Sequence, residues 1–152
     1  MIIEAVYESL VEWDPKQEKL VPMLATAWKV TPDGLSYTFE IRQGVKFHDG
    51  STLTARDVKV SLDRIREIGL GNSYLLGPVK SVTAIDDYTV EVTLSEPYAP
   101  FLAGLPLAYI VSSTAIAKHD QGDLSRDWLS MNEAGTGPYV LASWDLNQQF
   151  TL

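Results

Sequence analysis

The sequence contains no cysteine, and this absence removes several kinds of site at once. Disulfide bridges, thiolate zinc centres and cysteine nucleophiles are all excluded. The absence indicates no compartment, because an exported protein can do without bridges. Histidine is also scarce: the two histidines are His48 and His119, and each lies in polar sequence typical of a turn.

Basic side chains are in the minority. The chain has 12 lysines and arginines against 20 aspartates and glutamates, so its formal net charge is −8. Nucleic acids and anionic membrane surfaces require clustered lysine and arginine, and we therefore exclude both as partners. A hydrophobic fraction of 45% with a charged fraction of 21% is typical of a globular protein. The length of 152 residues suits one domain, or one domain and part of another.

Long apolar helices and a secretory signal are not expected either. Residues 97–117 carry no charge, but their prolines and hydroxyls favour short buried elements over a membrane span. Glu4 and Glu8 lie where a secretory signal would have a basic start and an apolar stretch. The chain also ends inside an apolar, strand-like run. We interpret both ends as positions inside a longer exported chain.

Two hairpins are the clearest features of the sequence. Tyr37, Phe39 and Ile41 alternate with polar residues, which predicts a half-buried strand over residues 35–42. A Pro-Asp-Gly turn joins this strand to residues 28–30. Residues 79–85 and 88–94 form a second pair, and the two aspartates between them indicate a hairpin tip in preference to a metal site.

The clearest helix begins after Thr54, which can act as a cap together with Asp57. Val58, Leu62 and Ile65 form its apolar stripe. The other expected elements are a helix at residues 3–10, a strand at 10–13, a helical turn at 22–27, short helices near 101–102 and 114–118, and strands at 109–111, 139–141 and 150–152. Together they predict an α+β fold, with an antiparallel or mixed sheet and packed helices.

A catalytic site has little support. His48 beside Asp49 could be a base with an orienting acid, but we favour a surface histidine next to a turn aspartate. The Gly135–Pro138 segment lacks the lysine and the helix that a phosphate loop requires. We therefore expect no enzyme, no cofactor and no metal. Tyr74 lies in a glycine-flanked loop outside any periodicity, so it either faces a cleft or packs under its own loop.

Several motifs resemble those of a known family. They are Leu24-Ala25, Trp28, Asp33-Gly34-Leu35, Tyr37-Thr38-Phe39, residues 42–50 (Arg-Gln-Gly-Val-Lys-Phe-His-Asp-Gly), Leu53-Thr54-Ala55, Asp57-Val58, Tyr88-Thr89-Val90, residues 96–102 (Glu-Pro-Tyr-Ala-Pro-Phe-Leu) and residues 135–139 (Gly-Thr-Gly-Pro-Tyr). In order and spacing they resemble family 5 of the extracellular solute-binding proteins, the oligopeptide, dipeptide and nickel type that serves ABC importers.

The resemblance implies a part of a longer protein with a two-lobed, type II periplasmic-binding-protein fold. Residues 1–97 would be its small peripheral domain, and residues 98–152 the truncated start of its main ligand-binding lobe. The complete protein would capture peptides or similar small solutes and deliver them to an ABC permease. It would be periplasmic, or extracellular and lipid-anchored. The loop of Asn72, Ser73 and Tyr74 is similar to a loop whose tyrosine faces the ligand.

Two other functions stay open. The chain could be a structural or assembly module that forms a homodimer through exposed strand edges and the apolar segment 97–117. It could also be an enzyme that uses His48 and Asp49. If the first interpretation holds, the isolated chain should bind peptides weakly or not at all, because it would offer one wall of a cleft. The sequence does not name the ligand, since fold does not determine function.

Overall fold

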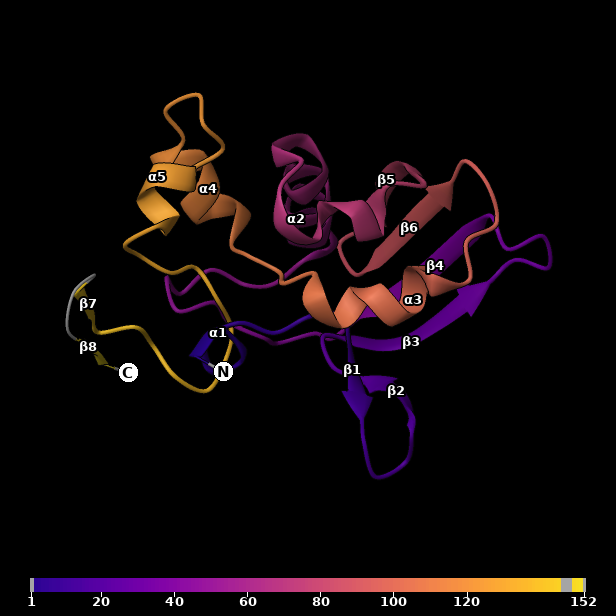
Figure 1. The fold of residues 1–152 in the computed structure, drawn as a ribbon, viewed down its shortest axis with the longest axis horizontal. Coiled ribbons are helices and arrows are strands. Elements are labelled where there is room, and N and C mark those ends of the chain that lie inside the picture. Colours follow the sequence, from indigo (N-terminus) through magenta and orange to yellow (C-terminus); the bar gives the residue numbers. More distant parts are fainter. Residues whose placement is uncertain (1, 146–148, 152) are drawn as a thin grey trace.

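The computed structural model describes residues 2–145 and 149–151. At its centre lies an antiparallel sheet whose four strands, in spatial order, are β3 (Ala25–Val30), β4 (Ser36–Ile41), β6 (Thr89–Leu94) and β5 (Val79–Asp86) (Figure 1). The predicted alternation is confirmed, because Tyr37, Phe39 and Ile41 are all buried. Phe39 lies opposite Val90 in the register, so the two predicted hairpins join into one sheet.

The first hairpin of the chain pairs β1 (Val11–Asp14) with β2 (Lys19–Pro22) and projects from the sheet (Figure 1). The helical turn predicted at residues 22–27 is wrong. Pro22 ends β2, and β3 begins at Ala25, opposite Ile41. The Ala25 N–H donates to the Leu10 carbonyl at 2.9 Å. Pairing with strands distant in sequence therefore overrides the local helical tendency of these residues.

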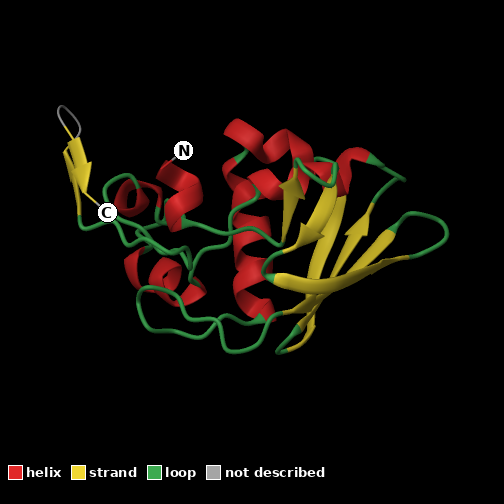
Figure 2. Ribbon diagram, turned by 90° about the horizontal axis from the view of Figure 1, so that it is seen from below, coloured by secondary structure: helices red, strands yellow, loops and turns green. Residues whose placement is uncertain are grey.

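The long helix α2 (Ala55–Ile68) packs along one side of the sheet (Figure 2). Val58 and Leu62 of the predicted stripe are fully buried. The helix ends at Gly69, whose φ of 66° is in the left-handed region that favours glycine. A 3₁₀ segment, η1 (Gly71–Leu76), follows where the sequence indicated an irregular loop.

Asp57 in the first turn of α2 is buried and connects two helices. Its Oδ2 accepts the backbone N–H of Thr54 at 2.8 Å and the Thr54 hydroxyl at 3.0 Å, which confirms the predicted cap. Its Oδ1 accepts the N–H of Ser113, the first residue of the later helix α4, at 2.9 Å. The cap of one helix is thus also the attachment point of another.

The remaining elements are short helices and one further pair of strands. They are α1 (Ile2–Val6), α3 (Pro100–Gly104), η2 (Leu105–Leu107), α4 (Ser113–His119), α5 (Arg126–Leu129), β7 (Ser143–Asp145) and β8 (Gln149–Thr151). Both short helices predicted after residue 97 are present. Among residues 2–145 and 149–151 no helix combines the length and the apolar character that crossing a membrane requires.

Two of the predicted strands are absent. Residues 109–111 make only an isolated bridge, from Tyr109 to Ser9, although Ile110 is completely buried as expected. Residues 139–141 form no strand; the pairing begins later, between β7 and β8. Leu152, at the end of the last predicted strand, lies outside the described residues. In both segments the backbone forms hydrogen bonds with the N-terminal part of the chain instead. A local sequence pattern does not reveal such distant partners.

The main hydrophobic core joins the sheet, α2 and the segment that follows residue 97. Phe101, Leu105 and Ile110 belong to the same buried cluster as Phe39. The Phe101 ring meets that of Tyr37 edge-on, with ring centroids 4.8 Å apart. A smaller cluster comprises Val111, Ala115, Ile116 and Ala134. The division into residues 1–97 and 98–152 stays a prediction.

Candidate functional site

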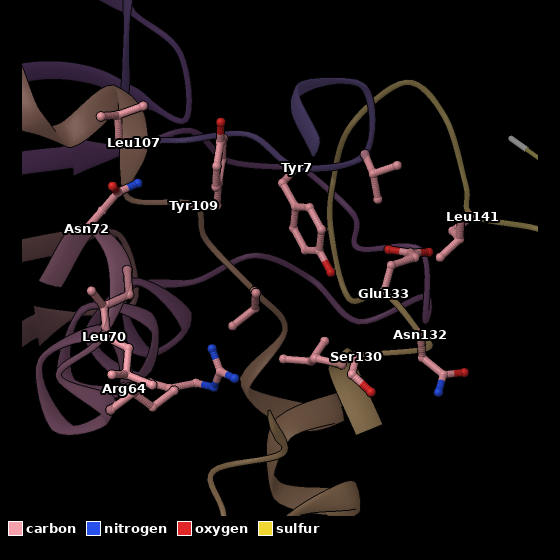
Figure 3. Close-up of a pocket in the computed structure, with 15 residues that line it drawn as sticks. Tyr7, Arg64, Leu70, Asn72, Leu107, Tyr109, Ser130, Asn132, Glu133 and Leu141 are labelled. Carbon is pink, nitrogen blue, oxygen red and sulfur yellow. The ribbon is translucent and has the colours of Figure 1, made fainter. Parts of the chain in front are cut away.

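A pocket of about 460 Å³ opens between α1, the end of α2 and residues 129–133 (Figure 3). Its apolar lining consists of Val6, Ile65, Ile68, Leu70, Leu107, Val111, Leu129 and Leu141. Its polar lining consists of Tyr7, Arg64, Asn72, Tyr109, Ser130, Asn132 and Glu133. An apolar hollow with a few convergent polar groups is the usual form of a small-molecule site.

Two tyrosines form part of the wall. The rings of Tyr7 and Tyr109 lie with centroids 6.2 Å apart, tilted by 43°. Burial raises the pKa of the Tyr7 hydroxyl to about 12, and burial together with the charge of Glu4 raises the pKa of Tyr109. The Tyr7 oxygen accepts the N–H of Ala134 at 3.3 Å. Both phenols are therefore neutral at physiological pH and can donate a hydrogen bond.

Arg64 is the basic residue of the pocket lining. Its guanidinium extends from α2 toward Tyr7 and Ser130 (Figure 3). The Nε–H donates to the carbonyl of Leu124 at 2.7 Å, which ties α2 to the loop before α5. Burial lowers the pKa of the guanidinium, but arginine stays protonated in proteins. The wall thus presents one fixed positive charge in apolar surroundings.

His48 is not the exposed turn residue that the sequence predicted. Its side chain is 13% exposed and lies between two acceptors, Glu133 Oε1 at 2.8 Å from Nδ1 and the Gly137 carbonyl at 2.7 Å from Nε2. The prediction is wrong because the covering segment comes 85 residues later in the chain. Asp49 does not orient the ring; it accepts the hydroxyls of Ser51 and Ser112 instead. The base with an orienting acid is therefore not formed by these two residues.

The covering segment, residues 133–139, is named the strap below. Its backbone makes four hydrogen bonds of 2.9 to 3.0 Å to other segments. Ala134 O accepts from Ser112 N–H and Gly135 O accepts from His48 N–H, whereas Gly137 N–H donates to Val6 O and Tyr139 N–H donates to Ala5 O. Through these bonds the strap fixes α1 against the beginning of α4. Since Glu133 also lines the pocket, the strap holds part of the pocket wall in place.

Glycine is required in the strap because the backbone of α1 is too close for a side chain. A Cβ on Gly135 would lie 2.1 Å from the Val6 carbonyl oxygen, and one on Gly137 would lie 2.5 Å from that of Ala5. Both distances are far below van der Waals contact. The Gly-Thr-Gly motif thus serves close backbone packing.

The three residues predicted to bind ligand all lie in η1. Asn72 lines the pocket, whereas Ser73 and Tyr74 are not part of its lining. Tyr74 is 67% exposed, so its side chain is not packed under its own loop. Sequence reasoning did not single out Tyr7, Arg64, Tyr109 and Glu133. In the sequence these four residues share only a polar or aromatic side chain near a run of apolar residues. Many other residues fit that description, so it could not identify them.

A metal centre has no support in the part of the chain that the structure describes, since no three histidine or acidic side chains there are grouped to hold an ion. The site is instead an apolar pocket with neutral hydroxyl donors, one cation and the carboxylate of Glu133. Residues 19–152 match the family of bacterial extracellular solute-binding proteins, family 5 Middle.

The chain belongs to this family. It is 36% identical over 152 residues to the probable D,D-dipeptide-binding periplasmic protein DdpA of Escherichia coli (strain K12), covering 96% of this chain and 29% of that protein. It is 34% identical over 148 residues to the glutathione-binding protein GsiB of Pectobacterium atrosepticum, covering 95% of this chain and 27% of that one. The chain thus spans under a third of the length of these relatives.

Solved structures show the same fold. The Campylobacter jejuni protein NikZ, in complex with Ni(L-His), superimposes with a TM-score of 0.88 at 28% identity, covering 98% of this chain and 30% of that one. The periplasmic binding protein DppA of Helicobacter pylori, in complex with the peptide STSA, gives 0.82 at 30% identity, covering 96% and 32%. The resemblance stated from the motifs is confirmed, as is the mixed fold of a two-lobed binding protein. The family consists of binding proteins for transport, not enzymes.

Proposed function

We propose that this chain is part of the substrate-binding component of an ABC importer, which captures peptides or similar small solutes outside the cytoplasmic membrane. The observation that carries the proposal is the family match over residues 19–152. The relatives DdpA and DppA are named as periplasmic. The complete protein would accordingly work in the periplasm, or anchored to lipid outside the cell, and would deliver its solute to a permease.

The wall that includes Tyr7, Arg64 and Asn72 is our proposed solute-facing surface. Ser73 and Tyr74 would extend it along η1, where the exposed ring of Tyr74 offers a flat apolar contact. Residues 1–97 would serve as the small peripheral domain, and residues 98–152 as the beginning of the main lobe. A second wall would come from parts of family members that this chain does not span.

The ligands named for the relatives support a small polar solute. They are a D,D-dipeptide, glutathione, Ni(L-His) and the peptide STSA. All of them carry groups that hydrogen-bond or bear charge. The pocket wall has matching partners in the Arg64 guanidinium and the neutral hydroxyls of Tyr7 and Tyr109. Its apolar lining would exclude water around them.

A titration of the 152-residue chain with a mixed peptide library, monitored by NMR, tests where a solute binds. We expect at most weak binding, with amide shifts concentrated at Asn72, Tyr74 and Tyr109. The reference residue is Trp13, an exposed aromatic on the β1–β2 hairpin. Shifts at Trp13 without shifts on the pocket wall would refute the site. A micromolar affinity, measured by calorimetry, would refute the idea that this chain offers one wall only.

One observation favours a second function, that of an assembly module. Several large apolar side chains are exposed around the pocket and the end of the strap, namely Leu70, Leu107, Met131, Tyr139 and Val140. A second copy of the chain could cover them and form a homodimer. Light scattering checks this alternative, since a chain that stays monomeric at high concentration would contradict it.

A further inference from the structure

The ring of His48 lies between two groups that can only accept hydrogen bonds. The Gly137 carbonyl has no proton to give, and a carboxylate such as that of Glu133 has none either. Both contacts are short, at 2.7 and 2.8 Å, which is the range of charge-assisted bonds. A neutral imidazole carries one N–H and can satisfy only one acceptor, whereas the imidazolium cation satisfies both.

We propose that His48 is a proton-operated clamp: as an imidazolium it binds Glu133 and Gly137 together and positions the strap, and loss of one proton opens one of the two bonds. The clamp adds a second link between residues 44–53 and the strap, beside the bond from the His48 backbone N–H to the Gly135 carbonyl at 3.0 Å. The strap in turn is bonded to α1. The inference goes beyond the proposed function, because it holds whether or not the pocket takes a solute.

Two carboxylates lie close to the ring of His48. Glu133 is 8% exposed, and its second oxygen accepts the N–H of Gly135 at 2.7 Å. Asp49 is the next residue in the chain and adds a second carboxylate. Burial alone would raise the pKa of Asp49, but hydrogen bonds from Ser112 and Ser51, with the charge of His48, outweigh it and lower that pKa. Two anions thus lie next to one cation.

The other charged and titratable groups near the clamp include both signs, since Arg64 lines the same pocket as Glu133 and acts on Tyr7. Glu8 accepts the hydroxyl of Thr136 at 2.7 Å and so lies against the middle of the strap. Tyr7 lies near Glu133 and stays neutral, since its pKa is about 12. Histidine is the side chain that ordinarily changes its charge between about pH 5 and 8. Loss of a ring proton would leave one of the two acceptors without a donor and so loosen the clamp.

NMR of the ring nitrogens tests the proton count directly, on the full 152-residue chain labelled with ¹⁵N in histidine. The chain has two histidines, so the variant His119→Gln leaves the signals of His48 alone. At pH 6 we expect both ring nitrogens of His48 to carry a proton and both N–H signals to be visible. A neutral tautomer at pH 6, with one bare nitrogen, overturns the proposal even if no variant of His48 folds.

Amide exchange of the strap tests the mechanical consequence. The reporters are the amides of Gly137 and Tyr139, which donate to α1. After correction for the intrinsic exchange rate, we expect their protection to fall about tenfold or more between pH 6 and 8, the effect of losing one charge-assisted bond. In the variant His48→Gln the protection should be low and independent of pH. Wild-type protection that is constant over this range, or equal to that of the variant, contradicts the clamp.

The variant His119→Gln is the matched control for exchange as well. His119 ends α4, and its ring stacks on that of Trp128 at a centroid distance of 4.1 Å. We expect its removal to leave the pH dependence at Gly137 and Tyr139 unchanged. If His119→Gln abolishes that dependence while His48→Gln does not, the proton switch lies at the other histidine and the proposal is wrong.

Discussion

Replacing Asp57 by alanine should destabilise the fold more than any other change at the start of α2. The carboxylate is 3% exposed and accepts three hydrogen bonds, two from Thr54 and one from Ser113, at 2.8 to 3.0 Å. Truncation leaves the Ser113 N–H buried without a partner and removes the cap of α2. A hydrogen bond to a charged group contributes about 1.5–3 kcal/mol, and a lost cap costs about 1 kcal/mol.

The benefit of no longer burying a carboxylate offsets part of this loss. We therefore expect Asp57→Ala to lower the free energy of unfolding by about 3 kcal/mol. With a urea dependence of about 1–3 kcal/mol per molar, the midpoint of unfolding should fall by roughly 1–2 M. The measurement is equilibrium urea unfolding, followed by circular dichroism and tryptophan fluorescence.

Asp63 on the same helix is the matched control. It pairs with Lys59 at 2.6 Å and with Arg66 at 3.1 Å, but all three side chains are partly exposed. Exposed ion pairs contribute about 0–1 kcal/mol, so Asp63→Ala should barely move the midpoint. If Asp57→Ala costs no more than Asp63→Ala, the buried carboxylate does not join α2 to α4 as described.

Two further predictions concern the strap and the pocket. Gly135→Ala should lower the free energy of unfolding by about 2 kcal/mol or more in thermal unfolding, because its Cβ would overlap the Val6 carbonyl. Gly77→Ala is the control and should cost less, since its Cβ would lie 3.2 Å from the nearest atom, the Tyr74 carbonyl oxygen. Equal losses in the two variants would refute the close approach at Gly135. Tyr7 has its pKa raised to about 12, so the stability that its burial contributes is complete below about pH 10 and is lost as the pH rises toward 12. In urea unfolding, Tyr7→Phe should flatten this loss of stability at alkaline pH, whereas Tyr74→Phe should not. Identical stability–pH profiles for the two variants would contradict the burial of Tyr7.

The elements that local patterns determine could be predicted from the sequence. Tyr37, Phe39 and Ile41 alternate because one face of β4 meets the core, and that period is visible in the chain. The start of α2 was predictable for the same reason, since Thr54 and Asp57 are three residues apart and cap one turn. Family membership followed from motifs of this local kind.

Features that depend on distant segments could not be predicted. Residues 22–27 favour a helical turn on their own, but Ala25 meets its partner Ile41 in the sheet. His48 is covered by Glu133 and Gly137, whose positions along the chain give no sign of the contact.

The pocket also depends on segments that are distant in the sequence. Its polar lining comes from the residue after α1, from α2 and η1, from Tyr109 and from residues 130–133, which only the folded chain brings together (Figure 3). Sequence reasoning reached one lining residue, Asn72, through the resemblance of its loop to a ligand-facing loop of the family. It missed Arg64 because a basic side chain beside an apolar stripe is the ordinary pattern of a surface helix.

A chimera can test whether this chain supplies one wall of a solute-binding site. In DdpA of Escherichia coli, the segment matched by this chain would be replaced by residues 1–152, and binding of a D,D-dipeptide would be measured by calorimetry. We expect the chimera to bind, Tyr74→Ala and Arg64→Met to weaken binding about tenfold or more, and Trp13→Ala to have no effect. A folded chimera whose affinity is the same with and without the Tyr74 and Arg64 side chains would contradict the claim.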